Sequence, residues 1–174
     1  ELAVSMRYMR NFGFETFDKA VFPGTNGKMP EVCAAMGLTN LDFLPTVVAT
    51  NQHHHAAYTD AFSVLPGISI MPYDAGESNN WQYVIAEVGD ECPVSRDEIV
   101  AALHAEGILA RKYFWPGCHN MKPFKELFPH AGLVLPNTPK VAERVIVLPT
   151  GTALPADAVA TIASVIRVLT SGTR

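Results

Sequence analysis

Cysteine is scarce in this sequence, and the spacing of the few cysteines excludes common metal sites. Cys33, Cys92 and Cys118 are widely separated and odd in number. They form no C-x-x-C pair, so no zinc-binding set is predicted. Free cysteines at such spacing are typical of a reducing compartment, and we expect the protein to be cytoplasmic.

Clusters of one charge and long apolar runs are also missing. The 13 Lys and Arg residues are scattered through 174 residues of net charge −4, so no nucleic-acid partner is expected. No apolar run reaches the ~20 residues that a membrane span requires, so no membrane partner is expected either. The N-terminal residues lack the order of a secretory signal. No P-loop, G-x-G-x-x-G or G-x-S-x-G motif occurs.

The sequence does contain enough apolar residues, 48%, to bury a core without disulfides or metals. Apolar periodicity and capping signals predict helices and strands in alternation. Helices are predicted over 2–10, 30–38, 44–62, 95–106, 121–128, 138–144 and 157–169, and strands over 68–71, 81–88, 108–115 and 145–148. This order favours an α+β layer with helices on one face of a small, mostly antiparallel sheet.

Two segments carry candidate binding residues. Gly24–Met29 combines turn glycines, Asn26 and Lys28 directly before a helix, which would suit an anion, although an ordinary turn explains the local pattern better. The segment 111–119 predicts a strand ending in a Pro-Gly turn, with Tyr113 and His119 close by. Binding of a substrate and a plain strand end explain this second pattern equally well.

Three consecutive histidines, His53–His55, suggest a metal site at first sight. On a helix, neighbouring residues point about 100° apart, so these side chains cannot converge on one ion. A solvated helix face is the favoured interpretation, and no metal ligand is predicted.

Several motifs together resemble the DegT/DnrJ/EryC1/StrS aminotransferases, with similarity along essentially the whole chain. The motifs are R-N-F-G-F (10–14), G-T-N-G-K-M (24–29), A-A-M-G-L (34–38), N-L-D (40–42), A-R-K-Y-F-W-P-G-C-H (110–119) and V-L-P-T-G-T (147–152). The resemblance implies the aspartate aminotransferase fold, also called fold type I. The versions of G-T-N-G-K-M and Y-F-W-P-G-C-H look most like members that act on dTDP-4-keto-6-deoxy sugars.

The resemblance also implies a reaction and its partners. In this family a lysine holds pyridoxal phosphate, and an amino group moves from glutamate to a keto sugar on a nucleoside diphosphate. The enzymes are homodimers. Asn26 matches the asparagine that reaches the cofactor phosphate of the neighbouring subunit, with Lys28 beside it. Tyr113 and His119 match a loop at the substrate mouth, here with altered spacing.

The cofactor lysine of the family lies before the R-N-F-G segment, in a motif flanked by serine and glycine. None of the lysines of this chain lies in that motif: Lys19, Lys28, Lys112, Lys122, Lys125 and Lys140. We therefore expect a fragment, a truncated product or one piece of a longer polypeptide, inactive by itself and without bound cofactor. Residues 1–45 are expected to be the tail of the large cofactor domain, and residues 46–174 the C-terminal small domain.

Two other functions stay open at this point. One is a non-catalytic, stand-alone small domain that serves in binding or assembly, which the missing lysine favours. The other is a distant fold-type-I enzyme with a substrate that is not a sugar. The sequence upstream of Glu1 would discriminate among all three.

Overall fold

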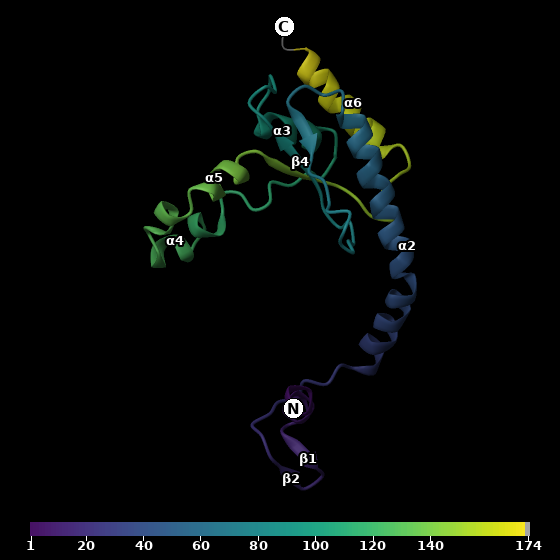
Figure 1. Cartoon of the computed structure of the whole chain (residues 1–174), viewed down its shortest axis with the longest axis vertical. Helices are drawn as coiled ribbons and strands as arrows, with labels where there is room; N and C mark the ends of the chain where they lie inside the picture. The colour runs from purple at the N-terminus through teal and green to yellow at the C-terminus, as the bar shows by residue number, and fades with distance from the viewer. Residues whose placement is uncertain (173–174) are drawn as a thin grey trace. The chain divides into compact units, whose positions relative to one another are not determined.

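The computed structural model describes residues 1–172 (Figure 1). The chain divides into two compact units, Glu1–Pro45 and Thr46–Arg174. We call them unit 1 and unit 2. Helix α2 contributes its first residues to unit 1 and its last residues to unit 2.

Unit 1 contains helix α1 (Leu2–Arg10) and a short antiparallel hairpin of β1 (Phe14–Thr16) and β2 (Lys19–Ala20). The predicted first helix is confirmed, and Gly13, with φ of 82°, lies in the left-handed region just after it. The hairpin was not expected, because strands of three and two residues are too short to show an alternating pattern.

Unit 1 has almost no core. Within Glu1–Pro45, all of which the structure describes, Gly13 is the only buried residue. Its exposed aromatic side chains are Phe12, Phe14, Phe17, Phe22 and Phe43. An apolar surface of this extent is typical of a surface that another protein surface covers.

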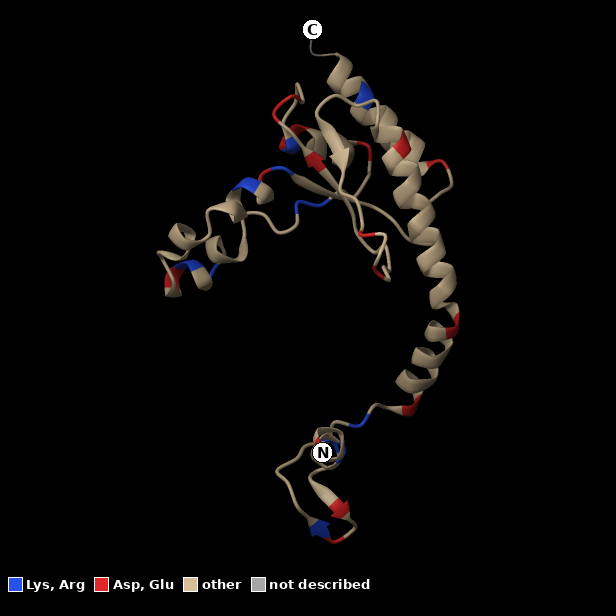
Figure 2. Cartoon of the chain, viewed as in Figure 1, with Lys and Arg blue, Asp and Glu red and all other residues tan. Residues whose placement is uncertain are grey.

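Helix α2 (Glu31–Phe62) is one helix where two were predicted, over 30–38 and 44–62. Pro45 lies inside it, although proline has no N–H to donate to the preceding turn and usually kinks or ends a helix. Figure 2 shows that α2 carries acidic residues but no Lys or Arg. Contrary to expectation, α2 is long and apolar enough to cross a membrane, by length and composition alone. Its last residues, Tyr58 and Phe62, instead lie in the core of unit 2.

The sheet of unit 2 is antiparallel, as predicted. It consists of β3 (Ile68–Ile70), β4 (Val84–Val88) and β5 (Val145–Leu148), in the order β3-β4-β5. Along β4, residues 84, 86 and 88 are buried while 85 and 87 are not, so one face of the sheet meets the core.

Helices α2, α3 (Arg96–Ala105) and α6 (Ala158–Ser171) supply the rest of that core. Helix α3 begins at the predicted place and with a capping box: Ser95 accepts from the Glu98 N–H, and the Glu98 carboxylate accepts from the Ser95 N–H at 2.7 Å. The predicted α+β class, with a small antiparallel sheet and helices, is confirmed.

The predicted strand over 108–115 is wrong. Only Arg111 pairs with β5, exchanging two backbone hydrogen bonds with Val147, and Trp115 N–H then donates to the Lys112 carbonyl in a turn. The chain continues through the short helices η1 (Cys118–Asn120), α4 (Phe124–Leu127), η2 (Ala131–Val134) and α5 (Asn137–Ala142).

Candidate functional site

Two motifs of unit 1, residues 10–14 and residues 24–29, contact each other and form one structural piece. Asn11 and Asn26 make an isolated antiparallel bridge, and the Phe12 N–H donates to the Thr25 carbonyl at 3.0 Å. The turn after α1 and the loop before α2 are thereby held together by their backbones.

Close backbone approach requires glycine at two positions of this piece. A Cβ on Gly13 would overlap the Phe22 carbonyl, and a Cβ on Gly24 would overlap the backbone of Phe12 and Gly13. Each motif therefore supplies one glycine to the contact between them.

Lys28 completes the piece with its side chain. Its Nζ donates to Asn11 Oδ1 at 3.0 Å and lies 4.7 Å from the centroid of the Phe12 ring. An ammonium group has three donors, so this contact leaves capacity for an anion. Lys28 and Asn26 are both exposed.

Two backbone N–H groups of this loop are already engaged. The Thr25 N–H donates to the Met9 carbonyl at 2.9 Å, and the Gly27 N–H donates to the Arg10 carbonyl at 2.8 Å. These two backbone donors are therefore not free for an anion, whereas the side chains of Asn26 and Lys28 are exposed.

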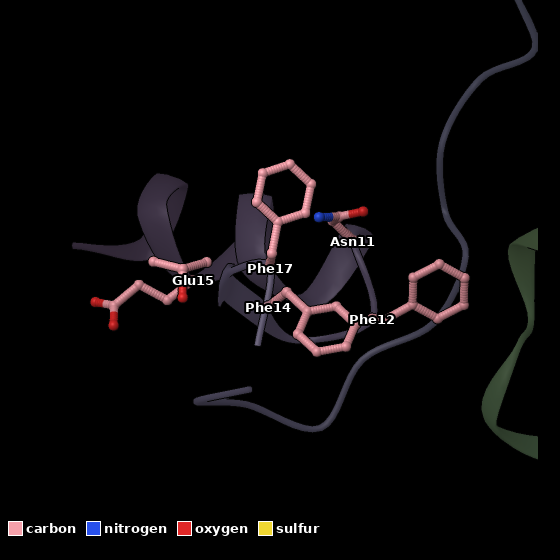
Figure 3. A pocket seen from close by; sticks show the side chains of 6 residues that line it. Asn11, Phe12, Phe14, Glu15 and Phe17 are labelled. Carbon is pink, nitrogen blue, oxygen red and sulfur yellow. The ribbon is translucent and has the colours of Figure 1, made fainter. Parts of the chain in front are cut away.

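Beside this piece lies a cavity of about 430 Å³ at the hairpin (Figure 3). Its lining consists of Asn11, Phe12, Phe14, Glu15, Thr16 and Phe17. The ring of Phe17 is 100% exposed, so the cavity has an aromatic rim open to solvent.

The two predicted substrate residues, Tyr113 and His119, come together in unit 2. They line one cavity of about 480 Å³, whose other wall includes Asn137, Thr138 and Val141 of α5. The other predicted pair, Asn26 and Lys28, lies in unit 1.

Tyr113 is held by its neighbours in sequence. Its hydroxyl accepts from Arg111, whose guanidinium lies 5.0 Å from the centre of the Tyr113 ring. The Phe114 ring stacks on the Tyr113 ring at 4.7 Å with an interplanar angle of 8°. Phe114 and Arg111 therefore both lie against the Tyr113 ring, and Arg111 also engages its hydroxyl.

His119 has one ring nitrogen engaged. Its Nε2 lies 3.0 Å from Asn120 Nδ2, so with the amide donating, the ring proton would lie on Nδ1. A Cβ at Gly117 would lie 2.8 Å from His119 Cε1, so glycine leaves room for the ring.

The interpretation of His53–His55 as a solvated face is wrong for two of the three residues. His54 is 9% exposed, and its Nδ1 lies 3.2 Å from Thr150 Oγ1. His55 is also buried, and its Nε2 lies 3.0 Å from the Met71 carbonyl oxygen. Burial first, and then the neighbouring His53, hold the pKa of His54 below its ordinary value.

Thr150 extends this contact, since its hydroxyl donates to Asn51 Oδ1 at 3.2 Å. One turn further along α2, the Tyr58 hydroxyl donates to the Pro149 carbonyl at 2.9 Å. The V-L-P-T-G-T motif is therefore anchored to α2 by buried polar groups, which sequence analysis did not predict. Among residues 1–172, no cluster of His, Cys, Asp and Glu could hold a metal ion.

Comparison with solved structures identifies the fold. DesI, crystallised in the presence of its TDP-sugar product, matches with a TM-score of 0.82 and 41% identity over 99% of this chain and 44% of DesI. DesV of S. venezuelae matches with a TM-score of 0.83 over 97% of this chain and 44% of DesV, and at 24% identity it supports the fold alone.

Sequence comparison identifies the family. Residues 1–167 match the DegT/DnrJ/EryC1/StrS aminotransferase family, and the chain belongs to that family. A dTDP-4-amino-4,6-dideoxy-D-glucose transaminase of Escherichia coli is 32% identical over 141 residues, which are 81% of this chain and 38% of that protein. Its counterpart in Shigella dysenteriae is 30% identical over 96% of this chain and 45% of that protein. The chain thus spans less than half the length of the relatives that it matches.

Proposed function

We propose that this chain is part of a pyridoxal-phosphate-dependent aminotransferase that moves an amino group from glutamate to a keto sugar of a nucleoside-diphosphate sugar. Glutamate would become 2-oxoglutarate, and the keto sugar would become an amino sugar. The 41% identity with DesI, a protein solved with its TDP-sugar product, is the observation that carries the proposal. Family membership over residues 1–167 supports it.

The side chains of unit 1 fit the phosphate of the cofactor. Asn26 offers an exposed amide donor, and Lys28 offers a positive charge that Asn11 holds in place. We assign no covalent lysine to this chain, and we propose that the chain alone does not transaminate. When bound, pyridoxal phosphate supplies the electron sink of the reaction.

Tyr113 and His119 are proposed to bind the nucleotide sugar. The cavity that they share offers an aromatic face, a phenol and an imidazole, which suit a sugar ring and its hydroxyl groups. This chain's part in the reaction is then to bind and orient the substrate, while the bond changes occur at the cofactor.

The complete enzyme is proposed to be a cytoplasmic homodimer, with Asn26 reaching the phosphate in the partner subunit. The aromatic surface of unit 1 supports an arrangement in which another protein surface covers it. The same surface also supports the second candidate function, a stand-alone module for binding or assembly. An assay of glutamate-dependent amination of a dTDP-linked keto sugar by the complete polypeptide separates the two.

A first experiment tests the assignment of the lysine. The chain is incubated with pyridoxal phosphate, reduced with borohydride and mapped by mass spectrometry. We expect no stoichiometric adduct on any lysine. A single lysine that is fully modified would show that the chain holds the cofactor covalently.

A second experiment tests Asn26. In the enzyme that contains this chain, Asn26→Ala should weaken cofactor binding by roughly ten- to a hundred-fold, because a hydrogen bond to a charged group contributes about 1.5–3 kcal/mol. Asn40→Ala, an exposed asparagine on α2, is the matched control. Equal cofactor affinity in both variants, with both dimeric, would contradict the role given to Asn26.

A further inference from the structure

Arg96, the first residue of α3, is a charged side chain that is only 4% exposed. Its Nη1 donates to two backbone carbonyls, of Ala142 at 2.7 Å and of Val145 at 3.1 Å. Its Nε donates to Asp97 Oδ1 at 2.5 Å. Burial of a guanidinium group is costly unless such partners compensate it, so this set of contacts is specific to arginine.

The same two residues of α3 hold the segment that carries Tyr113. The Trp115 ring lies 5.2 Å from Arg96 Cζ, and Lys112 Nζ lies 3.2 Å from Asp97 Oδ1. Tyr113 is therefore flanked on both sides by residues that are attached to the start of α3.

Arg96 also reaches the opposite wall of the substrate cavity. Ala142, whose carbonyl accepts from Arg96, ends α5 and lines the cavity together with Tyr113 and His119. Arg96 itself is not among the lining residues. One side chain outside the cavity thus contacts both of the segments that form it.

Asp97 is charged at neutral pH. Burial alone would raise the pKa of its carboxyl group, but hydrogen bonds from Arg96 and Lys112, and their charges, hold the pKa below its ordinary value. The ion pair is therefore complete under the conditions in which the enzyme would work.

We propose that Arg96 and Asp97 are a positioning pair that fixes the Tyr113–His119 segment against α5 and so sets the shape of the nucleotide-sugar cavity. The identity of the ligand in this cavity rests on the proposed function, whereas the positioning of the Tyr113–His119 segment does not. Arg96 acts through Trp115 and Ala142 and touches no substrate. Lysine cannot replace it, because an ammonium group does not present two parallel donors and a stacking plane.

Hydrogen exchange on the 174-residue chain tests the geometry without any ligand. In Arg96→Lys and Arg96→Met we expect amide exchange within 111–119 to rise at least ten-fold, while exchange in β3 and β4 stays near wild type. Arg144→Met is the matched control, because the Arg144 side chain pairs with the exposed Asp90 at 2.6 Å and is not among the residues that line the cavity. Wild-type exchange within 111–119 in a folded Arg96 variant would overturn the proposal, as would a uniform rise over all of unit 2.

If Arg96→Met fails to fold, Asp97→Ala and Trp115→Leu decide, since both residues are exposed. Asp97→Ala removes the contacts of Asp97 with Arg96 and Lys112, and Trp115→Leu removes the ring beside Arg96. Both variants should exchange faster than wild type within 111–119. Wild-type exchange in either variant would overturn the proposed positioning role.

Calorimetric titration with dTDP-4-amino-4,6-dideoxy-D-glucose adds the functional readout. We expect the Kd to rise about ten-fold in Arg96→Lys and to stay at wild type in Arg144→Met. Equal affinity in Arg96→Lys and wild type would overturn the positioning role. No binding by the wild type would count against the proposed function instead, while the exchange data would still decide the positioning role.

Discussion

The two units of this chain differ in how they use apolar residues. Unit 2 has a buried apolar core among α2, α3, α6 and one face of the sheet, as expected of a domain of its own, although its segment 109–135 also exposes apolar side chains. Unit 1 exposes its phenylalanines and is held together by backbone contacts between two glycine-containing turns. Unit 2 can therefore be stable by itself, whereas unit 1 has a defined shape without the burial that would stabilise it.

The largest expected effect comes from the same substitution made in each unit. Phe62→Ala should destabilise unit 2 by about 3–5 kcal/mol, because Phe62 is 1% exposed in the core and packs against Tyr58. Phe17→Ala in unit 1 should leave the unfolding midpoint unchanged. Urea unfolding followed by circular dichroism measures both. Similar losses in the two variants would mean that unit 1 has a core of its own.

A glycine substitution should instead affect unit 1 and leave unit 2 unchanged. Gly24→Ala should disrupt the contact between residues 10–14 and 24–29, because the new Cβ would overlap backbone atoms. Unfolding of unit 2 should not change, while amide protection of Gly27 should be lost. Gly37→Ala on α2, where a Cβ would meet nothing within 4 Å, is the control and should stabilise the helix. Unchanged protection of Gly27 in Gly24→Ala would contradict the glycine contact.

A smaller effect tests the start of α3 in unit 2. Ser95→Ala removes one half of the capping box and should destabilise unit 2 by about 1 kcal/mol. Ser164→Ala, on the exposed face of α6, should not destabilise it. Equal midpoints for the two variants in thermal unfolding would show that the cap contributes little.

The smallest effect is the pH dependence that His54 gives to unit 2. The pKa of His54 is lowered from 6.5 in the folded protein, so the unfolded chain binds a proton more readily just below pH 6.5. The free energy of unfolding should therefore fall as pH decreases through this range. His54→Gln should show a shallower fall than wild type, and His53→Gln, which removes only the smaller of the two causes of the shift, should lie between them. Identical pH profiles for all three proteins would contradict this assignment.

Local features of the structure could be predicted from the sequence. The helices over 2–10 and 95–106 depend on periodicity and capping signals within a few consecutive residues, so both were predicted correctly. Tyr113 and His119 are only six residues apart in the sequence, so their placement beside one cavity could also be predicted from a local motif.

Features that depend on distant residues could not be predicted. Residues 108–115 have the composition of a strand, but only Arg111 finds a free partner on β5. His54 is buried because Thr150, 96 residues further along the chain, lies against it. Arg96 looked like an ordinary first-turn residue, since its acceptors Ala142 and Val145 lie more than forty residues away.

The single pair between Arg111 and Val147 has a consequence for aggregation. A sheet with open edges can recruit strands from other molecules, and short or covered edges prevent this. In unit 2 one edge strand, β3, has only three residues, and the other, β5, is partly covered where Arg111 takes both backbone groups of Val147. The sheet thus offers little length to an incoming strand, so when this protein is expressed alone, self-association through its strands should be rare.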